Sequence, residues 1–280
     1  MHPLRSVLLL GLLLAETATA VADNNGTAPA AVDGPRPIIS IIIDDLGHQR
    51  HSGLRAIDLP GPLTYAILPH RPFTRLLASH AHRHNKEVMI HIPMEAETGK
   101  ALGPGALLYD MAERQFKTAV RDNFDAVPHA VGFNNHMGSR LTASASRMRW
   151  LMQAAMFRDD LYFIDSRTTH HSVALEQAGQ RRIRSASRDI FLDYRNDEQV
   201  VAQQLAKLVE RARRDGTALA IGHPYPATLD MLERWLPTLQ DHGVRLVPVS
   251  QLIEIRQQRR DSIWPRYSSR SHKVVRNSKP

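Results

Sequence analysis

The sequence contains no cysteine. This absence excludes disulfide bonds and any metal site built on thiolates. A bound metal would therefore have to sit on histidine, aspartate or glutamate side chains. An oxidising compartment is compatible with this composition but is not demonstrated by it.

The sequence also lacks an apolar run long enough to cross a bilayer comfortably. Its most apolar segment, residues 7–15, follows the basic Arg5 and precedes the small residues Ala18-Thr19-Ala20. This pattern predicts a secretory signal peptide over residues 1–20, with an uncleaved anchor as the alternative. Residues 21–36 are rich in Ala, Asn, Gly, Pro and Thr and are expected to form a flexible linker. We therefore expect a periplasmic or secreted protein.

The body of the chain carries little net charge. The formal charge is +8, and the segment from position 256 onward supplies +7 of it through eight Lys or Arg residues and one Asp. A basic, Ser-rich segment without hydrophobic periodicity predicts a disordered tail over residues 257–280. This tail could touch an anionic envelope surface, whereas export argues against nucleic acid as a partner.

Short apolar runs alternate with helical patterns throughout residues 37–256. Strands are expected at residues 38–43, 65–68, 87–92, 129–133, 161–164, 182–186, 218–221 and 244–247. Apolar residues recur at helical spacing in residues 73–84, 112–124, 146–157, 197–214 and 227–239. This alternation predicts an α/β fold with parallel strands, and seven or eight units favour an irregular (β/α) barrel. A doubly wound open sheet is the alternative.

Polar residues gather where these strands end. They are Asp44, Asp45, His91, Asn134, Asn135, His136, Asp165, Arg167, Arg188, Asp189 and His223. The carboxyl ends of parallel barrel strands lie on one rim, where barrel active sites are found. The coincidence of so many such residues predicts a functional site at that rim. Six other histidines fall on helix or loop positions and are expected to face solvent: His48, His51, His70, His80, His82 and His84. His170 and His171 could be rim residues, but a helix start is preferred for them.

The residue types at the rim are those of a metal-dependent hydrolase. Such a metal takes neutral His nitrogens and a carboxylate, with one position left for water. Asp45, His91 and His136 could supply these ligands from three strand ends. Adjacent side chains of an extended strand point apart, so a bend is needed for Asp44 to take a proton from water beside Asp45. His223 could donate a proton to a leaving group.

Each of these residues also has a purely structural interpretation. An Asp-Asp pair after a strand often caps a turn or a helix, and His91 could be a core histidine. Asp193 fits a cap and a supporting role in the site equally well. Three arginines could hold carboxylates in place or bind an anionic substrate: Arg140, Arg167 and Arg188.

Six motifs occur in one order along the chain. They are IIIDDLG at 41–47, HIPME at 91–95, NNHMGSR at 134–140, FIDSRT at 163–168, RDIFLD at 188–193 and IGHP at 221–224. Together they resemble the divergent polysaccharide deacetylases (YibQ-like), which are distant relatives of the NodB-type carbohydrate esterases. The resemblance covers residues 37–254. It implies an irregular (β/α) barrel and the removal of N- or O-acetyl groups with a divalent metal, usually zinc.

The resemblance also implies roles for individual residues. The first Asp of the first motif acts as the base in that family and the second binds metal, which makes Asp44 the base and Asp45 a ligand. The late His motif implies that His223 is the catalytic acid. These roles agree with those that the residue types favour.

Two motifs of the NodB-type relatives are altered here. Their His-x-x-x-His motif corresponds to His91-x-x-x-Glu95, so the second histidine is missing, and Glu95 or His136 could replace it. Their Arg-x-Pro motif is absent, with Asn135 and His136 in its place. The remaining rim residues are expected to bind substrate or support the site: Glu95, Asn135, Arg140, Asp165, Arg167, Arg188 and Asp189.

These observations lead to one main functional hypothesis and two rivals. The main hypothesis is a periplasmic, metal-dependent hydrolase that deacetylates a polysaccharide, with an acetylated amino sugar of the cell envelope as substrate and zinc as the expected metal. The first rival is a catalytically altered barrel that binds cell-wall glycan or regulates a partner. The second is a metal-dependent hydrolase of another bond.

Overall fold

The computed structural model describes residues 36–263. The predicted signal peptide, the predicted linker up to residue 35 and residues 264–280 of the predicted tail lie outside the described residues. Within residues 36–263, nine strands form a single parallel sheet. They are β1 (Ile38–Leu46), β2 (Thr64–Ile67), β3 (Glu87–Met94), β4 (Ala130–Met137), β5 (Tyr162–Asp165), β6 (Ser185–Ser187), β7 (Ile190–Phe191), β8 (Thr217–Gly222) and β9 (Arg245–Leu246).

Helices occupy most of the connections between these strands. They are α1 (Arg50–Ile57), α2 (Thr74–Arg83), α3 (Glu113–Ala126), α4 (Ser139–Thr142), α5 (Ala145–Ala155), α6 (Ala174–Gly179), α7 (Glu198–Asp215), α8 (Pro226–Trp235), the 3-10 turn Leu236–Thr238, and α9 (Val249–Ile263). The longest, α7, begins at Asp197, whose carboxylate accepts hydrogen bonds from the Gln199 and Val200 amides. It ends at Gly216, whose φ of 77° suits glycine.

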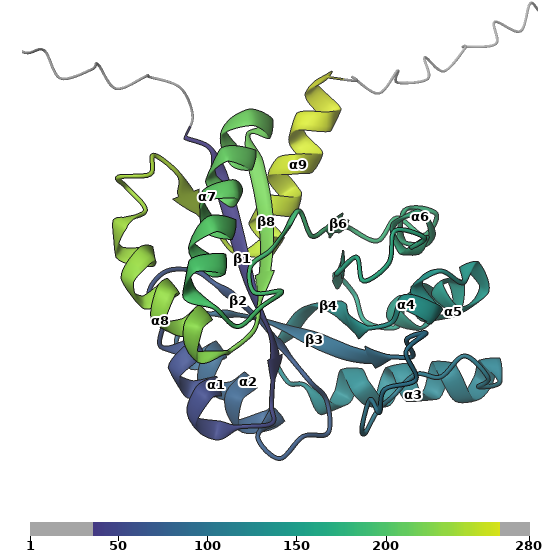
Figure 1. The fold of residues 1–280 in the computed structure, drawn as a ribbon. Coiled ribbons are helices and arrows are strands. Elements are labelled where there is room, and N and C mark those ends of the chain that lie inside the picture. Colours follow the sequence, from purple (N-terminus) through teal and green to yellow (C-terminus); the bar gives the residue numbers. More distant parts are fainter. Residues whose placement is uncertain (1–35, 264–280) are drawn as a thin grey trace, which may run out of the picture. The chain divides into compact units, whose positions relative to one another are not determined.

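The sheet is curled into an incomplete barrel. Its strand order is β6-β5-β4-β3-β2-β1-β8-β7, and β9 pairs with the start of β1. Within the described residues no ladder joins β6 to β7, so the curl stays open between them. Figure 1 shows the two flanks, with α7 and α8 on one side of β1 and β8, and α3 to α6 on the other. The predicted α/β barrel of parallel strands is thus confirmed in its open form.

Alternating residues of each strand serve two separate cores. One core lies between the sheet and its outer helices and includes Ile39, Ile41 and Ile43 of β1. The other lies inside the curl and includes Ile38 and Ile42 of the same strand. This is the period of two that a strand imposes on its side chains. The inner core is tightly packed at Gly132, where an added Cβ would lie 2.4 Å from the Tyr162 ring.

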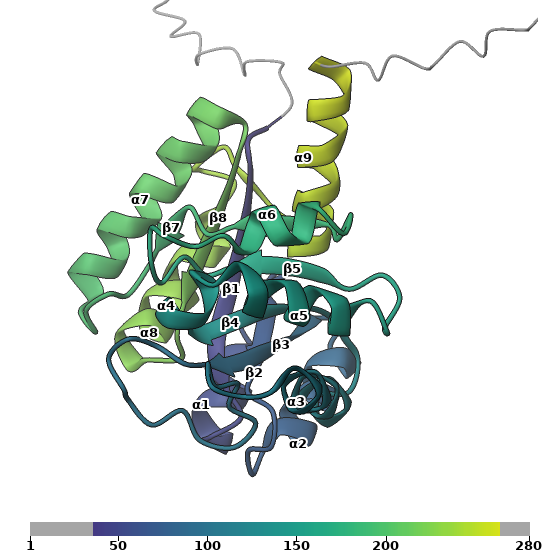
Figure 2. The same ribbon diagram turned by 90° about the vertical axis from the view of Figure 1, so that its right-hand side faces the viewer.

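Helix α9 fills part of the space inside the curl. Its residues Val249, Leu252 and Ile253 are buried in the inner core. The helix continues to Ile263, so the predicted tail boundary at residue 257 is wrong, since residues 257–263 are helical. Arg256 fixes the middle of the helix by donating hydrogen bonds to Thr217 Oγ1 (2.9 Å) and Asp189 Oδ2 (2.6 Å). Figure 2 shows α9 rising beside the start of β1. Among residues 36–263 no helix has the length and apolar character of a membrane span.

Candidate active site

The candidate site lies on the inner face of the curled sheet, where the strands end. On three strands, the residue two positions after the last inner-core residue is polar. These pairs are Ile42 and Asp44, Met89 and His91, and Ile221 and His223. Because these positions share the period of the inner core, their side chains point into the same space. Helix α9 fills the other end of that space, which leaves the polar end free to be a site.

A local distortion of β1 turns two adjacent carboxylates toward one cluster. The pairing register of β1 with β2 shifts between Ile43 and Leu46. Within that shift Asp45 has a φ of 61°, a left-handed conformation that aspartate tolerates better than most residues. The bend required for Asp44 and Asp45 to act together is therefore present.

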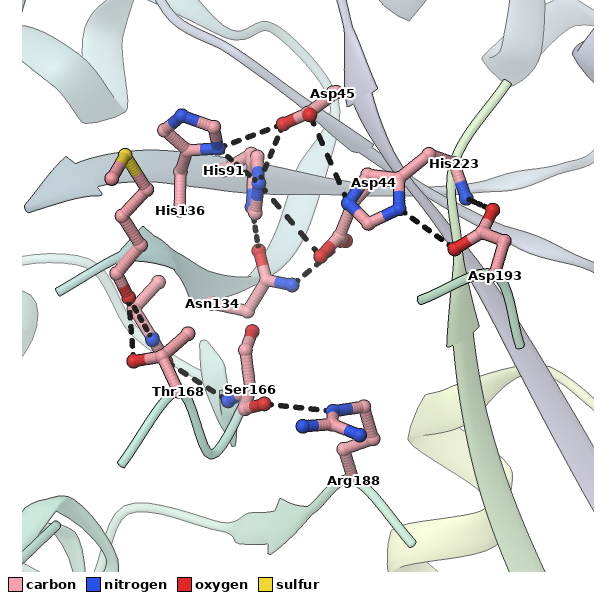
Figure 3. Close-up of polar contacts among 12 residues, drawn as sticks. Asp44, Asp45, His91, Asn134, His136, Ser166, Thr168, Arg188, Asp193 and His223 are labelled. Carbon is pink, nitrogen blue, oxygen red and sulfur yellow. Dashed lines mark hydrogen bonds and ion pairs between the residues drawn. The ribbon is translucent and has the colours of Figure 1, made fainter. Parts of the chain in front are cut away.

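Asp45, His91 and His136 bring three ligand atoms together. Asp45 Oδ1 lies 3.1 Å from His91 Nε2 and 2.8 Å from His136 Nδ1. The two ring nitrogens lie 3.1 Å from each other. Figure 3 shows the three side chains converging on one point, from β1, β3 and β4.

Asn134 determines which nitrogen of His91 faces that point. Its Nδ2 donates a hydrogen bond to Asp44 Oδ1 (2.9 Å), so its Oδ1 accepts from His91 Nδ1 (2.7 Å). Asn134 and His91 face each other across the β3–β4 ladder, and both are buried. With the proton on Nδ1, the Nε2 lone pair of neutral His91 points at Asp45. A second hydrogen bond of this kind orients metal-binding histidines in many proteins.

The residues present fit a divalent cation. Asp45 Oδ1 is buried and makes no hydrogen bond of acceptable geometry, although two imidazole nitrogens lie close to it. Burial alone would raise the pKa of Asp45, but His136 and His91 outweigh it and hold that pKa well below its usual range. A carboxylate oxygen and two imidazole nitrogens are a ligand set that suits zinc and its neighbours.

Asp44 lies beside this cluster without joining it. Its Oδ2 is 3.7 Å from His91 Nε2, and its Oδ1 accepts the hydrogen bond from Asn134. Burial raises the pKa of Asp44, against the opposing effects of His91, His223 and the Asn134 hydrogen bond. A carboxylate of raised pKa, held by one amide, has the properties of a general base.

His223 approaches the cluster from the other side of Asp45. Its Nε2 lies 3.8 Å from Asp45 Oδ2, and its Nδ1 lies 2.9 Å from Asp193 Oδ1. Asp193 is itself fixed, because its Oδ2 accepts from the His223 amide (2.6 Å) and from Thr228 Oγ1 (2.7 Å). Burial alone would lower the pKa of His223, but Asp193 and then Asp45 and Asp44 raise it to about 9. An imidazole that keeps its proton at neutral pH can act as a general acid.

A cavity of about 450 Å³ opens onto these groups. Twelve residues line it: Asp44, His91, Asn135, His136, Met137, Ser166, Arg167, Thr168, Arg188, Phe191, Ile221 and His223. Three of the supporting residues predicted from the sequence therefore contact it, namely Asn135, Arg167 and Arg188, and Asp165 holds the turn that carries Arg167.

Asn135 and Asp165 shape the cavity through backbone contacts. Asn135 accepts a hydrogen bond from the Ser166 amide (2.9 Å) and donates to Met137 O (2.7 Å). Asp165 accepts from the Arg167 amide (2.8 Å) and from Ser172 Oγ (2.7 Å). Both side chains are buried, and these hydrogen bonds hold the loops after β4 and β5 in place.

Three of the predicted supporting residues lie elsewhere. Glu95 forms a close ion pair with Arg140 and accepts a hydrogen bond from the Tyr109 amide (2.6 Å). Glu95 therefore does not replace the missing histidine. Asp189 also points away from the cavity, because it accepts from the Leu219 amide (2.8 Å) and from Arg256. It joins β8 to α9, which corrects the expectation that it serves the site.

Two residues of the site were not singled out by the sequence prediction. Asn134 was grouped with the polar residues at the strand ends, but its neighbour Asn135 was selected instead. Asp193 was left between a cap and a supporting role. The signal for Asp193 was available, because a catalytic histidine usually has a carboxylate partner on its second nitrogen.

The part of the chain that matches a known family includes the whole candidate site. The sequence profile of the family described as divergent polysaccharide deacetylase matches residues 41–253. The chain belongs to this family. The match includes Asp44, Asp45, His91, His136 and His223, as well as their supporting residues Asn134 and Asp193.

The relatives of this family member include uncharacterized proteins. The uncharacterized protein YibQ of Escherichia coli (strain K12) is 34% identical over 215 residues, which cover 77% of this chain and 67% of that protein. An uncharacterized protein from Agrobacterium tumefaciens C58 has a similar structure, with a TM-score of 0.74 at 22% identity, covering 79% of this chain and 90% of that one.

The fold is also that of an enzyme of named activity. A mutant of the peptidoglycan deacetylase PdaC from Bacillus subtilis has a TM-score of 0.53 at 15% identity, covering 85% of this chain and all (100%) of that one. At this identity the likeness concerns the fold alone. It places this chain in the same group of curled (β/α) barrels.

Proposed function

We propose that this protein is a metal-dependent hydrolase that removes acetyl groups from an acetylated amino sugar of a cell-envelope polysaccharide. The observation that carries the proposal is a set of three convergent ligand atoms, a separate buried carboxylate and an Asp-paired histidine. Four of the residues in this set line one cavity: Asp44, His91, His136 and His223. Each of these groups answers one need of amide hydrolysis. Membership of the deacetylase family supports the reaction class.

Asp45, His91 and His136 would hold the cation. Bound there, a divalent ion such as zinc would supply a Lewis acid that stabilises negative charge on the carbonyl oxygen in the transition state. Asn134 prepares His91 for this role by fixing its Nδ1 proton, which leaves Nε2 free as a ligand.

Asp44 takes a proton from the attacking water in this proposal. Its Oδ1 is occupied by the Asn134 amide, so Oδ2, which lies on the His91 side, is the oxygen free to accept the proton. Attack of the water on the acetyl carbonyl carbon forms the new C–O bond and gives a tetrahedral intermediate.

His223 completes the reaction by donating a proton from Nε2 to the sugar nitrogen as the C–N bond breaks. Asp193 accepts from Nδ1 and thereby orients the ring with Nε2 toward Asp45 and the cavity. The products are acetate and a free amine, and Asp44 and His223 then exchange their protons with solvent. Asp193 acts only through His223 and is a positioning residue.

The rival proposal of a glycan-binding barrel without activity rested on the missing second histidine of the His-x-x-x-His motif. In the described geometry His136 of β4 lies beside His91 and presents Nδ1 to Asp45. The neighbouring strand thus supplies a nitrogen that the sequence motif lacks, and this favours the enzyme. The envelope location remains a proposal that rests on the predicted signal peptide.

Acetate release tests this function. The purified chain is stripped of metal, reloaded with zinc and incubated with N-acetylated chito-oligosaccharides and with peptidoglycan, and released acetate and new amines are measured. We expect Asp44→Asn to keep its zinc and to lose acetate release, because the base is lost while the ligands stay. The matched control is Asp122→Asn, at an exposed aspartate of α3.

The result that would refute this function is equally specific. No acetate from any acetylated glycan at full zinc occupancy would reject the deacetylase. Hydrolysis of a different bond that still requires Asp44 would instead identify the second rival, a metal-dependent hydrolase of another class.

A further inference from the structure

The cavity has a second polar region that the proposed reaction does not use. It consists of Ser166 and Arg167, in the turn after β5, and Arg188, after β6. Figure 3 shows Ser166 and Arg188 set apart from the cluster of Asp45, His91 and His136. We call these three residues the basic wall.

Arg188 is held in place but is not neutralised. Its Nε donates to Ser166 O (2.8 Å) and its Nη2 to Arg167 O (3.1 Å), and the guanidinium lies 4.9 Å from the Phe191 ring centroid. Both hydrogen-bond acceptors are uncharged backbone carbonyls. Among residues 36–263 no carboxylate lies within ion-pair distance of it. Burial lowers the pKa of Arg188, and Asp44, Asp165 and Asp189 oppose this from beyond ion-pair distance. A fixed, half-buried guanidinium without a direct carboxylate partner favours an anionic ligand.

Arg167 adds a second positive charge at the same place. Its φ of 50° is a left-handed conformation, and the Asp165 carboxylate holds the turn by accepting from the Arg167 amide. The side chain is exposed and lines the cavity, and it forms no ion pair or hydrogen bond with other described residues. The turn therefore presents a free guanidinium to whatever enters.

Ser166 supplies an independent sign of a missing ligand. Its side chain lines the cavity and is 6% exposed, yet its Oγ has no hydrogen-bond partner in the described part of the chain. Buried hydroxyls nearly always have a partner. A ligand group that accepts a hydrogen bond would satisfy this one.

We propose that the basic wall binds a carboxylate on the sugar, so that the substrate is an acidic amino-sugar glycan and not a neutral one. A carboxylate has two oxygens, which together can accept from the Ser166 hydroxyl and from both guanidinium groups. This inference rests on the proposed function, because it assumes that the cavity receives the sugar to be deacetylated. It adds the chemical class of that sugar.

Binding to the metal-free full-length chain tests the inference without any hydrolysis. Three probes are compared by calorimetry: the disaccharide of N-acetylglucosamine and N-acetylmuramic acid, which carries a carboxylate; neutral N,N′-diacetylchitobiose; and N-acetylglucosamine 6-phosphate. We expect the carboxylated disaccharide to bind about ten-fold more tightly than chitobiose, as one or two charge-assisted hydrogen bonds would give. The preference should decrease as salt is raised.

Substitutions show which residues cause the preference for the carboxylated disaccharide. Arg167→Gln is expected to weaken binding of the carboxylated disaccharide much more than binding of chitobiose, and Arg188→Lys to reduce the preference in part. The matched control is Arg140→Gln, since Arg140 is already paired with Glu95 and does not line the cavity. Equal affinity for the carboxylated and neutral disaccharides, or an equal loss for both probes in Arg167→Gln, would refute the basic wall as a carboxylate site. Tighter binding of the phosphate would refute the choice of carboxylate.

The two proposals fail in different ways. Acetate release from neutral and acidic glycans with the same kcat/KM would leave the deacetylase intact and reject the acidic substrate. A clear binding preference without acetate release from either glycan would reject the deacetylase and keep the carboxylate site.

Discussion

Two clusters of metal-competent side chains occur among residues 36–263, and they differ in how they are held. One is Asp45, His91 and His136 at the strand ends. The other is Asp58, His80 and His84 on the outer surface, where α1 and α2 end. Both offer one carboxylate and two imidazoles within the reach of a single ion, so composition alone does not distinguish them.

The strand-end cluster is held from several directions. Its ligands come from three strands of one sheet, His91 is only 2% exposed, and Asn134 fixes the proton of its other nitrogen. The side chains therefore have little freedom to lose when an ion binds. Pre-organisation of this kind is what separates a metal site from a chance group of ligands.

The surface cluster has no comparable support. Asp58 is 63% exposed, and its only described contact with the histidines is the 3.4 Å approach to His80 Nε2. His84 is the C-cap residue of α2, and its Nδ1 donates a hydrogen bond to the backbone carbonyl of His80 (2.9 Å). Binding an ion there would have to order side chains that are free to move in water, which costs conformational entropy.

The largest expected effect comes from removing a ligand of the strand-end cluster. We expect His91→Ala to lower zinc affinity by more than the roughly 10–100-fold that loss of a supporting residue costs. An open three-ligand site has no spare ligand to compensate. Chelator competition measures the affinity, with His80→Ala as the matched surface variant. Comparable losses in the two variants would remove the distinction between the clusters.

A substitution at Asn134 tests whether the hydrogen bond that orients His91, and not only the identity of the ligands, sets the zinc affinity of the strand-end cluster. We expect Asn134→Ala to lower zinc affinity by roughly 10–100-fold, because His91 loses the group that fixes its Nδ1 proton. Asn123→Ala is the control, since Asn123 is also fully buried but hydrogen-bonds Gly105 O and His70, away from the cavity.

Both asparagine variants should lose stability to a similar degree, roughly 1–3 kcal/mol, because each leaves buried polar partners unsatisfied. Chemical denaturation of the metal-free proteins measures this loss. The interpretation fails if Asn123→Ala weakens zinc binding as much as Asn134→Ala does.

Zinc should also stabilise the fold through the strand-end cluster. A ligand at 100 times its Kd that binds only the folded state adds about 2.7 kcal/mol to the free energy of unfolding. We expect this gain in the parent chain and in the double variant His80→Ala/His84→Ala, but not in His91→Ala. Denaturant titrations with and without zinc measure it. A gain that disappears in the double surface variant would mean that zinc acts mainly through α1 and α2.

The sequence was sufficient to predict most of the regular architecture. The five predicted helical patterns correspond to α2, α3, α5, α7 and α8, because their apolar residues recur at helical spacing over two turns or more. Helix α9 was missed for the opposite reason. Its buried residues Val249, Leu252 and Ile253 occupy only its first turns, and the rest of the helix is polar.

The feature of the site that was hardest to predict is which of two adjacent residues contacts the metal-binding cluster. The fourth strand was expected to end at residue 133, whereas β4 continues to Met137. Inside a strand, neighbouring side chains point to opposite faces. Asn134 therefore faces Asp44 and His91, whereas Asn135 contacts the loop at Ser166.

Arg188 and Asp189, in the connection between β6 and β7, also have different environments. Both follow a predicted strand, and both were expected to serve the site. Arg188 lines the cavity, whereas Asp189 turns to the Leu219 amide and Arg256. The two-residue strand β7, which begins directly after Asp189, is too short to be predicted from a hydrophobic pattern.

The smallest expected effect concerns the surface cluster alone. We expect His84→Ala to leave the zinc affinity of the strand-end cluster unchanged to within about two-fold, because distant sites without shared partners behave additively. His84 caps the end of α2, where its ring contacts His80, and it does not line the cavity. The control is His82→Ala, since His82 instead stacks on His129, with ring centroids 4.0 Å apart. Calorimetric titration measures the zinc affinity of the strand-end cluster in each variant. A larger change in His84→Ala than in His82→Ala would show that the two clusters are coupled, and the contrast between a supported and an unsupported set of ligands would then have to be abandoned.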